Sequence, residues 1–350
     1  IKLAPVIAEC ERRELDFFTV YTNQHCLEEM RDPFFKDLGV PDPDYQLVEA
    51  SVSQFERINA YVRGIGKILS RKKPGLLLVQ GDTDTGLAAA VTSNRLGVRL
   101  GHLEAGLRCY DFEMREEMNR FIMDHLSSYC FAPTQSQVDN LLGEGVPEVR
   151  VFTTGNTITD AVRENIDEAI SRHALLKKLG VRAGEYFFFT CHRRETTDSR
   201  HKLACVLDSV GLFGKQERLT PLFVVHPRTL DRIKAFGLNV PGNIKLVTPK
   251  GYQDNLCLLY NADFVFTDSG GIQEESCILR KKCLVLREST ERPETIGFGG
   301  ARLIHGKSCS EILEQAGILL NQKVDWRNPY GNHSVSGRIL DICLQGDLFH

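Results

Sequence analysis

Short runs rich in β-branched and aromatic residues alternate along the chain with stretches of helical periodicity, such as residues 54–70 and 116–127. Near-continuous apolar strands joined by helical crossovers are typical of a parallel sheet that helices cover on both faces. The apolar runs predict strands at residues 17–21, 76–80, 98–103, 129–132, 186–190, 222–225, 244–247, 264–266 and 283–286.

The alternation starts afresh after Thr154-Gly155-Asn156-Thr157, and no low-complexity linker separates the two halves. We therefore predict an α/β fold of two Rossmann-like, doubly wound domains, which suits a chain of 350 residues. Residues 1–156 would form the first domain, with residues 335–350 packing back on it, and residues 157–334 would form the second. Because Ile1–Ile7 reads as a helix with no strand before it, we expect the first strand to precede Ile1.

The most informative segment runs from Phe264 to Glu275, where an apolar run leads into Asp268-Ser269-Gly270-Gly271 and then into a helical pattern. A strand, a glycine turn and a helix N-terminus together offer backbone N–H groups and the positive end of a helix dipole to an anion. A carboxylate at Glu275 is placed to accept a ribose hydroxyl proton. This segment indicates a nucleotide diphosphate site, although an ordinary capped strand-to-helix turn has the same pattern.

Polar residues follow other strands too, and ligands of open α/β sheets bind beyond the carboxyl ends of the strands. The candidates follow five of the expected strands: residues 81–83, 102–108, 192–194, 226 and 268–271.

Composition narrows the class of protein. The 43 Lys and Arg and 46 Asp and Glu residues leave a net charge of −3, which argues against a nucleic-acid binder and against a membrane-surface protein. No apolar run has the roughly 18 residues of a spanning helix. The 11 cysteines have no metal-ligand spacing, so we expect buried, reduced thiols in a cytoplasmic enzyme.

Taken together, the motifs resemble the non-hydrolysing UDP-N-acetylglucosamine 2-epimerases in order and spacing over the whole chain. The motifs are Gly81-Asp82-Thr83-Asp84-Thr85, His102-Leu103-Glu104-Ala105-Gly106-Leu107-Arg108, Glu116-Glu117-Met118-Asn119-Arg120, Gly155-Asn156-Thr157, His192-Arg193-Arg194-Glu195, residues 268–275 and Thr290-Glu291-Arg292-Pro293-Glu294. The resemblance implies two domains facing a cleft, as in B-type glycosyltransferases, and a homodimer. It also implies interconversion of UDP-N-acetylglucosamine and UDP-N-acetylmannosamine without a metal or nicotinamide cofactor.

The resemblance carries over onto individual residues. The implied catalytic groups are Asp82, Glu104, Glu116 and His192. The implied contacts with the UDP-sugar are Lys2, Asp82, Glu104, His192, Lys250, Asn255, Ser269, Gly270, Gly271, Glu275 and Arg292. A second, allosteric nucleotide-sugar site is matched only in part, by Gln24, Gln54, Arg194 and His226.

The chain departs from the family pattern at a few places. The Gly-Thr-Arg-Pro-Glu segment, with its phosphate-contacting arginine, would stand before Ile1. Arg115 stands where a proline usually precedes the paired glutamates, and Asn255 replaces an apolar or aromatic residue near the uracil.

Each candidate carboxylate also has a structural interpretation. Asp82 is placed to cap the helix that follows Gly81, and Glu116 complements the dipole at a helix start. Glu104 follows a strand and has the weakest structural explanation. Arg108 and Arg120 are expected to form ion pairs that hold the loop carrying Glu116.

Three other functions stay open at this point. A hydrolysing epimerase would release free N-acetylmannosamine and UDP from the same glucal intermediate. A retaining glycosyltransferase shares the fold but needs an acceptor, and a nucleotide-sugar sensor would bind UDP without turnover.

Overall fold

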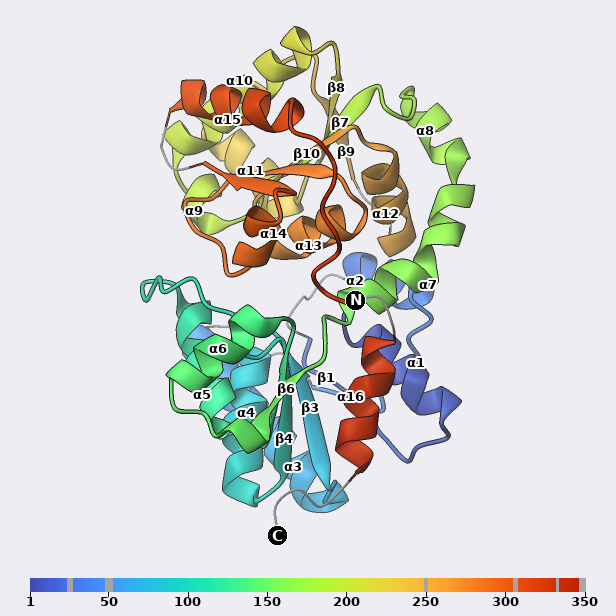
Figure 1. Cartoon of the computed structure of the whole chain (residues 1–350), viewed down its shortest axis with the longest axis vertical. Coiled ribbons are helices and arrows are strands. Elements are labelled where there is room, and N and C mark those ends of the chain that lie inside the picture. Colours follow the sequence, from blue (N-terminus) through green and yellow to red (C-terminus); the bar gives the residue numbers. More distant parts are fainter. Residues whose placement is uncertain (24–27, 48–52, 249–250, 305–307, 332–333, 346–350) are drawn as a thin grey trace. The chain divides into compact units, whose positions relative to one another are not determined.

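In the computed structural model, two compact units make up the chain: residues 1–161 with 329–350, and residues 162–328. The structure describes residues 1–23, 28–47, 53–248, 251–304, 308–331 and 334–345. Each unit contains parallel sheets flanked by helices (Figure 1), so the prediction of an α/β fold is confirmed.

The first unit has a four-stranded sheet in the order β3-β4-β5-β6 and a separate pair, β1-β2, and every pairing is parallel. Its strands are β1 (Val20–Tyr21), β2 (Tyr45–Gln46), β3 (Leu76–Gln80), β4 (Arg99–Leu103), β5 (Tyr129–Ala132) and β6 (Val151–Thr153). Its helices are α1 (Ala4–Arg12), α2 (Glu28–Asp37), α3 (Gln54–Lys72), α4 (Asp84–Leu96), α5 (Arg115–Leu126), α6 (Gln135–Gly143), the short η1 (Glu148–Arg150) and α16 (Val335–Leu344), while α7 (Ile158–Ser171) carries the boundary between the units.

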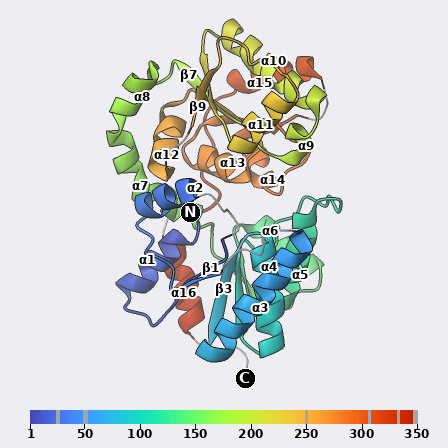
Figure 2. The same ribbon diagram turned by 180° about the vertical axis from the view of Figure 1, so that it is seen from behind.

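Helices cover both faces of the four-stranded sheet. On one face, Leu69 of α3, Ala89 of α4 and Met123 of α5 pack on Val79 and Leu100 of the sheet, and Figure 2 shows α3, α4 and α5 along this face. On the other face, α1 and α16 bury apolar side chains against β4 and β5. The C-terminal segment thus completes the core of the first unit.

The strand expected at residues 17–21 is reduced to Val20 and Tyr21, which pair with Tyr45 and Gln46. The backbone N–H of Thr19 donates to the side chain of Asp44 at 2.7 Å instead of to a strand. The apolar run is therefore longer than the partner with which it can pair.

The second unit has one six-stranded parallel sheet in the order β12-β11-β10-β7-β8-β9. Its strands are β7 (Tyr186–Thr190), β8 (Thr220–Val224), β9 (Lys245–Val247), β10 (Phe264–Thr267), β11 (Lys282–Val285) and β12 (Ala301–Leu303). Its helices are α8 (His173–Leu179), α9 (Arg194–Thr197), α10 (Arg200–Gln216), α11 (Pro227–Ala235), α12 (Tyr252–Asn261), α13 (Gly270–Ile278), α14 (Pro293–Gly297) and α15 (Cys309–Leu320). This is the strand order of dinucleotide-binding folds, and the winding direction reverses between β7 and β10.

The aromatic run of β7 is explained by burial on both faces. Phe187 and Phe189 pack in the cluster that contains α10 and α15. Tyr186 and Phe188 point to the opposite face, toward α8 and α12. Because side chains alternate along a strand, a strand covered on both sides must be apolar at every position.

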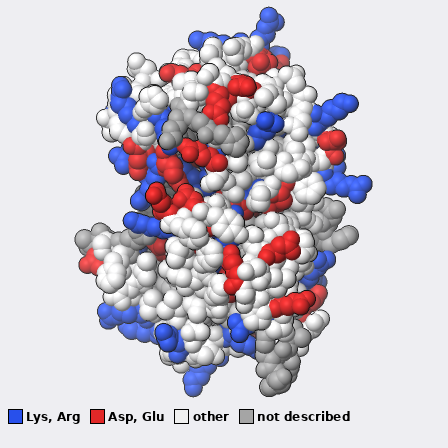
Figure 3. Space-filling view, turned by 60° about the vertical axis from the view of Figure 1, so that its left-hand side comes forward, with Lys and Arg blue, Asp and Glu red and all other residues white. Residues whose placement is uncertain are grey.

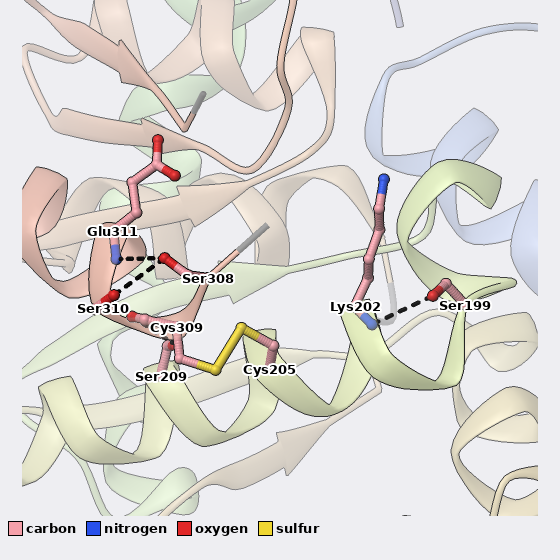
Figure 4. The surroundings of a disulfide bond; sticks show 8 residues. All are labelled: Ser199, Lys202, Cys205, Ser209, Ser308, Cys309, Ser310 and Glu311. Atoms are coloured by element: carbon pink, nitrogen blue, oxygen red, sulfur yellow. Dashed lines mark hydrogen bonds between the residues drawn. A yellow bond between two sulfur atoms is a disulfide. The ribbon is translucent and has the colours of Figure 1, made fainter. Parts of the chain in front are cut away.

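The cysteine expectation is wrong at one place, since Cys205 of α10 and Cys309 of α15 form a disulfide (Figure 4). Their Cα atoms are 5.3 Å apart, within the usual span of a disulfide. The hydroxyl of Ser209 donates to the carbonyl of Cys309 at 3.3 Å, and Ser308 caps α15. The bridge therefore joins two helices on one face of the sheet.

On the face drawn in Figure 3, acidic and basic side chains are interspersed with uncharged ones. Among the residues that the structure describes, no helix combines the length and the apolar character needed to cross a bilayer.

Substitution of Gly155 tests whether the turn after β6 depends on close packing against the C-terminal segment. Its φ is +92°, and a side chain there would overlap the backbone carbonyl of Tyr330, which accepts the N–H of Asn156 at 3.0 Å. Gly145 has a similar φ of +86° but open space around it. We expect Gly155→Ala to lower the free energy of unfolding by about 2 kcal/mol more than Gly145→Ala, measured by urea denaturation. Equal losses would show that Tyr330 does not constrain the turn.

Candidate functional site

Glu104 stands directly after β4 with a left-handed φ of +68°, a backbone conformation that is strained for a residue with a side chain. Its carboxylate is buried and receives donors from three distant segments. The ammonium of Lys2 pairs with Oε1, and the amide of Gln80 donates to Oε2. The amide of Asn156 donates to Oε1 at 3.1 Å. Because a carboxylate that only accepts is ionised, this set of donors favours the charged form of Glu104.

A small cavity lies beside this carboxylate. It is lined by Leu103, Glu104, Phe131, Thr154, Gly155, Asn156, Thr157 and Ile339. A Cβ placed at Gly81 would lie 3.8 Å from Oε2 of Glu104, so the strand end before Asp82 comes close to the Glu104 carboxylate.

Asp82 does not cap the following helix, as its structural interpretation required. The cap is Thr83, whose hydroxyl accepts from the N–H of Gly86 at 3.2 Å. The carboxylate of Asp82 is 30% exposed and pairs with Arg120, and its own carbonyl accepts from the amide of Asn119 at 2.9 Å. Asp82 is thus held by α5 while its carboxylate stays accessible.

Arg120 is buried and also pairs with Glu117, so one guanidinium joins two carboxylates. Glu117 further accepts the backbone N–H groups of Cys109 and Tyr110, at 3.1 and 2.7 Å. Burial raises the pKa of Glu117, but the hydrogen bond and charge of Arg120 and these backbone donors prevail and lower it. The loop before α5 is therefore fastened by Glu117.

Glu116 lies in the exposed first turn of α5. It forms no ion pair within the described part of the chain, and the structure does not bring it into contact with Asp82 or Glu104. Of the three candidate carboxylates, only Asp82 and Glu104 are fixed by partners.

His102 and Arg108 meet a buried carboxylate of α5, Asp124. The ring of His102 contacts Oδ1 of Asp124 at 2.6 Å and the carbonyl of Gly81 at 2.7 Å. Both neighbours are acceptors, so both ring nitrogens donate and the ring is an imidazolium. Arg108 pairs with Asp124 at 2.8 Å and with Glu144 at 2.6 Å. As expected, Arg108 and Arg120 both form ion pairs near the loop that precedes α5.

In the second unit, α13 begins at Gly270 directly after β10, and the hydroxyl of Ser269 accepts from the N–H of Ile272 at 3.5 Å. A Cβ at Gly271 would meet only the Ser269 hydroxyl, at 3.9 Å. The motif predicts that N–H groups of this first turn bind an anion, and the space beside Gly271 is compatible with that prediction.

Gly270 is required for a different reason, because a side chain there would overlap the guanidinium of Arg292. Arg292 is buried and pairs with Glu274 at 2.6 Å and with Glu291. Glu291 also pairs with Arg287 at 2.7 Å and with Arg193 at 3.3 Å. This network of ion pairs holds the Arg292 guanidinium against Gly270 in the first turn of α13.

His192 lies at the end of β7, with its side chain 39% exposed and Nδ1 3.2 Å from Oδ1 of Asp268. The ring of His226 lies near it, with 6.0 Å between ring centroids. His226 caps α11 by accepting the N–H of Arg228 at 3.2 Å. Arg194 is exposed in α9.

Glu275 is buried on α13 beside Tyr252, and burial, followed by the Glu275 charge, raises the pKa of Tyr252. The side-chain oxygen of Asn255 on α12 is buried without a hydrogen-bond partner among the described residues. Gln24 and Lys250, and the side chain of Gln54, lie outside the described residues.

Several residues of this site escaped sequence reasoning, above all Gln80, Asp124 and the role of Asn156. Gln80 ends a strand beside a recognised motif, which is a usable signal, whereas nothing in the sequence connects Asp124 with His102. Among the described residues, no group of three or more His, Cys, Asp or Glu side chains is arranged to hold a metal ion.

Comparison with known proteins places this geometry among nucleotide-sugar enzymes. The family described as UDP-N-acetylglucosamine 2-epimerase matches residues 8–344. The UDP-N-acetylglucosamine 2-epimerase of Methanocaldococcus jannaschii is 39% identical over 99% of this chain and 96% of its own. The crystal structure of that archaeal enzyme with UDP-GlcNAc and UDP superposes with a TM-score of 0.93, covering 99% of this chain and 96% of the other at 38% identity. The UDP-2,3-diacetamido-2,3-dideoxy-D-glucuronate 2-epimerase of Pseudomonas aeruginosa is 31% identical over 96% of this chain and 93% of its own.

The buried imidazolium of His102 predicts a pH dependence of stability. Burial lowers its pKa, but the Asp124 charge and the hydrogen bonds to Asp124 and Gly81 prevail and raise it above its usual value of 6.5. The stabilisation is therefore complete below about pH 6.5 and declines as pH rises toward the folded-state pKa. We expect the difference in unfolding free energy between the wild type and His102→Gln to shrink from pH 6 to pH 9. A constant difference would show a neutral ring.

Proposed function

We propose that this chain, which belongs to the family of UDP-N-acetylglucosamine 2-epimerases, interconverts UDP-N-acetylglucosamine and UDP-N-acetylmannosamine by eliminating and re-adding UDP. The observation that carries the proposal is the match over nearly the whole chain to an archaeal enzyme of that name. The ionised, buried Glu104 and the open first turn of α13 supply the chemistry that such a reaction needs.

The reaction must invert C2 of the sugar, whose proton is not adjacent to a carbonyl. Breaking the C1–O bond first expels UDP, and the positive charge that develops at C1 acidifies the C2 proton. A carboxylate then removes that proton and leaves 2-acetamidoglucal and UDP. Re-addition of UDP, with a proton delivered to the opposite face of C2, gives the epimer.

The second unit would hold the nucleotide. The N–H groups around Ser269, Gly270 and Gly271 stand at the N-terminus of α13, where a diphosphate is stabilised by the helix dipole. His192 would donate to the departing diphosphate, and Glu275 would accept a ribose hydroxyl. Arg292, Asn255 and Lys250 complete the proposed nucleotide contacts.

The first unit would move the proton. Glu104 and Asp82 are the fixed carboxylates, and their surroundings differ: Glu104 is buried among three donors, while Asp82 is 30% exposed and paired with Arg120. Glu116, exposed in the first turn of α5, is the third candidate. Lys2, paired with Glu104, would set the charge next to the sugar.

Assembly and location are further proposals. We propose a homodimer that acts in the cytoplasm, which analytical ultracentrifugation and cell fractionation would test. An allosteric nucleotide-sugar site at Gln24, Gln54, Arg194 and His226 would appear as sigmoidal kinetics in UDP-N-acetylglucosamine.

Two alternatives differ from this reaction in what they release. A hydrolysing epimerase would release free N-acetylmannosamine and UDP, whereas a sensor would bind UDP and form no product. The Pseudomonas aeruginosa relative is named for a diacetamido-glucuronate, so this substrate should be assayed in parallel. Product analysis by NMR separates all of these outcomes.

In deuterated water we expect deuterium at C2 of both UDP-sugars at equilibrium, because the carboxylate that removes the proton exchanges it with solvent before return. NMR of the products after incubation with UDP-N-acetylglucosamine measures this. Epimerisation with full retention of the C2 proton would rule out the elimination route.

Substitution tests the role of Glu104. We expect Glu104→Gln to lower kcat at least about 100-fold while leaving UDP affinity nearly unchanged, because the diphosphate contacts lie in the second unit. Glu148→Gln, at an exposed position in η1, is the matched control and should be fully active. A folded Glu104→Gln protein with near-normal turnover would remove Glu104 from the mechanism.

A further inference from the structure

Asp268 and His192 stand on either side of the point at which the sheet of the second unit reverses its winding. β10 and β7 are neighbours, and Thr267 pairs with Thr190 at the ends of the two strands. The next residue on β10 is Asp268, and His192 follows two residues after Thr190. Ligands of this strand order bind at this position, so both side chains occupy the preferred part of the sheet.

Asp268 is completely buried and uses one oxygen to hold the neighbouring loop. Its Oδ2 accepts the backbone N–H groups of His192 and Arg193, both at 2.8 Å. The loop after β7 is therefore tied to the end of β10, and the imidazole of His192 is placed over the same carboxylate.

The second oxygen is directed at the imidazole. Nδ1 of His192 lies 3.2 Å from Oδ1, and this buried oxygen accepts no aligned hydrogen bond from the described residues. A buried acceptor without a hydrogen bond is unfavourable, and catalytic hydrogen bonds in ligand-free structures are often poorly aligned until substrate binds. The geometry points to a pair that aligns fully in the working enzyme.

We propose that Asp268 is the positioning residue of His192: it holds the imidazole with Nδ1–H toward Oδ1, so that the doubly protonated ring can donate from Nε2 to the departing diphosphate. This inference rests on the proposed function for the role of His192. It adds a residue to which the sequence motif assigns no part of its own, since Asp268 only precedes the Ser-Gly-Gly turn.

The charge of Asp268 supports this assignment. Burial raises its pKa, but the close approach and charge of His192, together with the two backbone donors, prevail and lower it, so the carboxylate is ionised. An ionised Oδ1 accepts only, so the ring nitrogen that faces it must carry a proton, and Nε2 is left to face the ligand.

Other titratable and charged groups face the pair. Burial raises the pKa of the Cys191 thiol well above its ordinary value, so this group stays neutral. His226, after β8, lies beside the His192 ring. Arg193 and Glu195 lie in the segment after β7, and Arg193 pairs with Glu291, which lies after β11.

The substitution Asp268→Asn separates the two roles of this carboxylate. The asparagine oxygen can replace Oδ2 and keep both backbone hydrogen bonds, while its NH₂ group faces Nδ1. Two donors cannot face each other, so the ring must take the Nε2–H tautomer when it is neutral. Asp263→Asn, an exposed carboxylate at the opposite end of β10, is the matched control.

NMR of protein labelled with ¹⁵N-histidine shows which ring nitrogen carries the proton. The His192 signals are assigned by comparison with His192→Gln. In the wild type we expect the neutral ring to carry its proton on Nδ1. In Asp268→Asn we expect the Nε2–H tautomer. Wild-type His192 in the Nε2–H tautomer, or an Nδ1–H tautomer retained in Asp268→Asn, would overturn the inference.

Kinetics tests the consequence for turnover. We expect Asp268→Asn to lower kcat about 100-fold with little change in KM, because the asparagine NH₂ group cannot pair with the doubly protonated ring that donates to the diphosphate. The double variant Asp268→Asn/His192→Gln should be no slower than His192→Gln alone, because Asp268 acts through His192. Additive losses would overturn the inference by showing a merely structural role.

The two proposals can fail separately. Absence of C2 exchange in the wild type would overturn the proposed reaction, while the tautomer measurement would still decide whether Asp268 orients His192. An unchanged His192 tautomer in Asp268→Asn, in an enzyme that does exchange the C2 proton, would overturn only the positioning role.

Discussion

Charged carboxylates buried around the carboxyl ends of parallel strands are the constraint on which much of this protein depends. An ionised carboxylate removed from water needs several donors: Glu104 and Asp268, at strand ends, and Asp124, on α5, obtain them from other segments of the chain. Lys2, Gln80 and Asn156 converge on Glu104, so its geometry exists only when the segment before α1, the end of β3 and the turn after β6 are all in place. Folding of the first unit and formation of its site are therefore one event.

The fold class followed from local patterns because those patterns have local causes. The run Tyr186–Thr190 is apolar at every position since both faces of β7 are covered, and no tertiary information is needed to recognise it. Strand length is different, because it depends on a partner: β1 extends over two residues since β2 does. The disulfide between Cys205 and Cys309 was equally inaccessible, because 104 residues separate two cysteines that no spacing rule connects.

The candidate site, too, was predictable from the sequence only where local patterns determine it. Motif residues at strand ends could be placed on one edge of a sheet from the alternation alone. Their partners could not, because the contact of His102 with Asp124 and that of Asp82 with Arg120 depend on how α5 packs. The structural interpretation of the glycine turn is confirmed, since Ser269 caps α13, and this cap does not exclude the nucleotide site that the motif predicts.

The space at Gly270 has a consequence for how such sequences change over time. The glycine leaves room for the guanidinium of Arg292, which is held in turn by Glu274 and Glu291. Positions 270 and 292 therefore cannot diverge independently: a lineage that enlarges the first must shorten or lose the second, and the buried Glu274 would then lose this cation, whereas Glu291 would keep Arg287 and Arg193. Such an exchange requires compensating replacements, which makes this corner of the second unit resistant to drift for reasons of packing alone, whether or not a ligand contacts it.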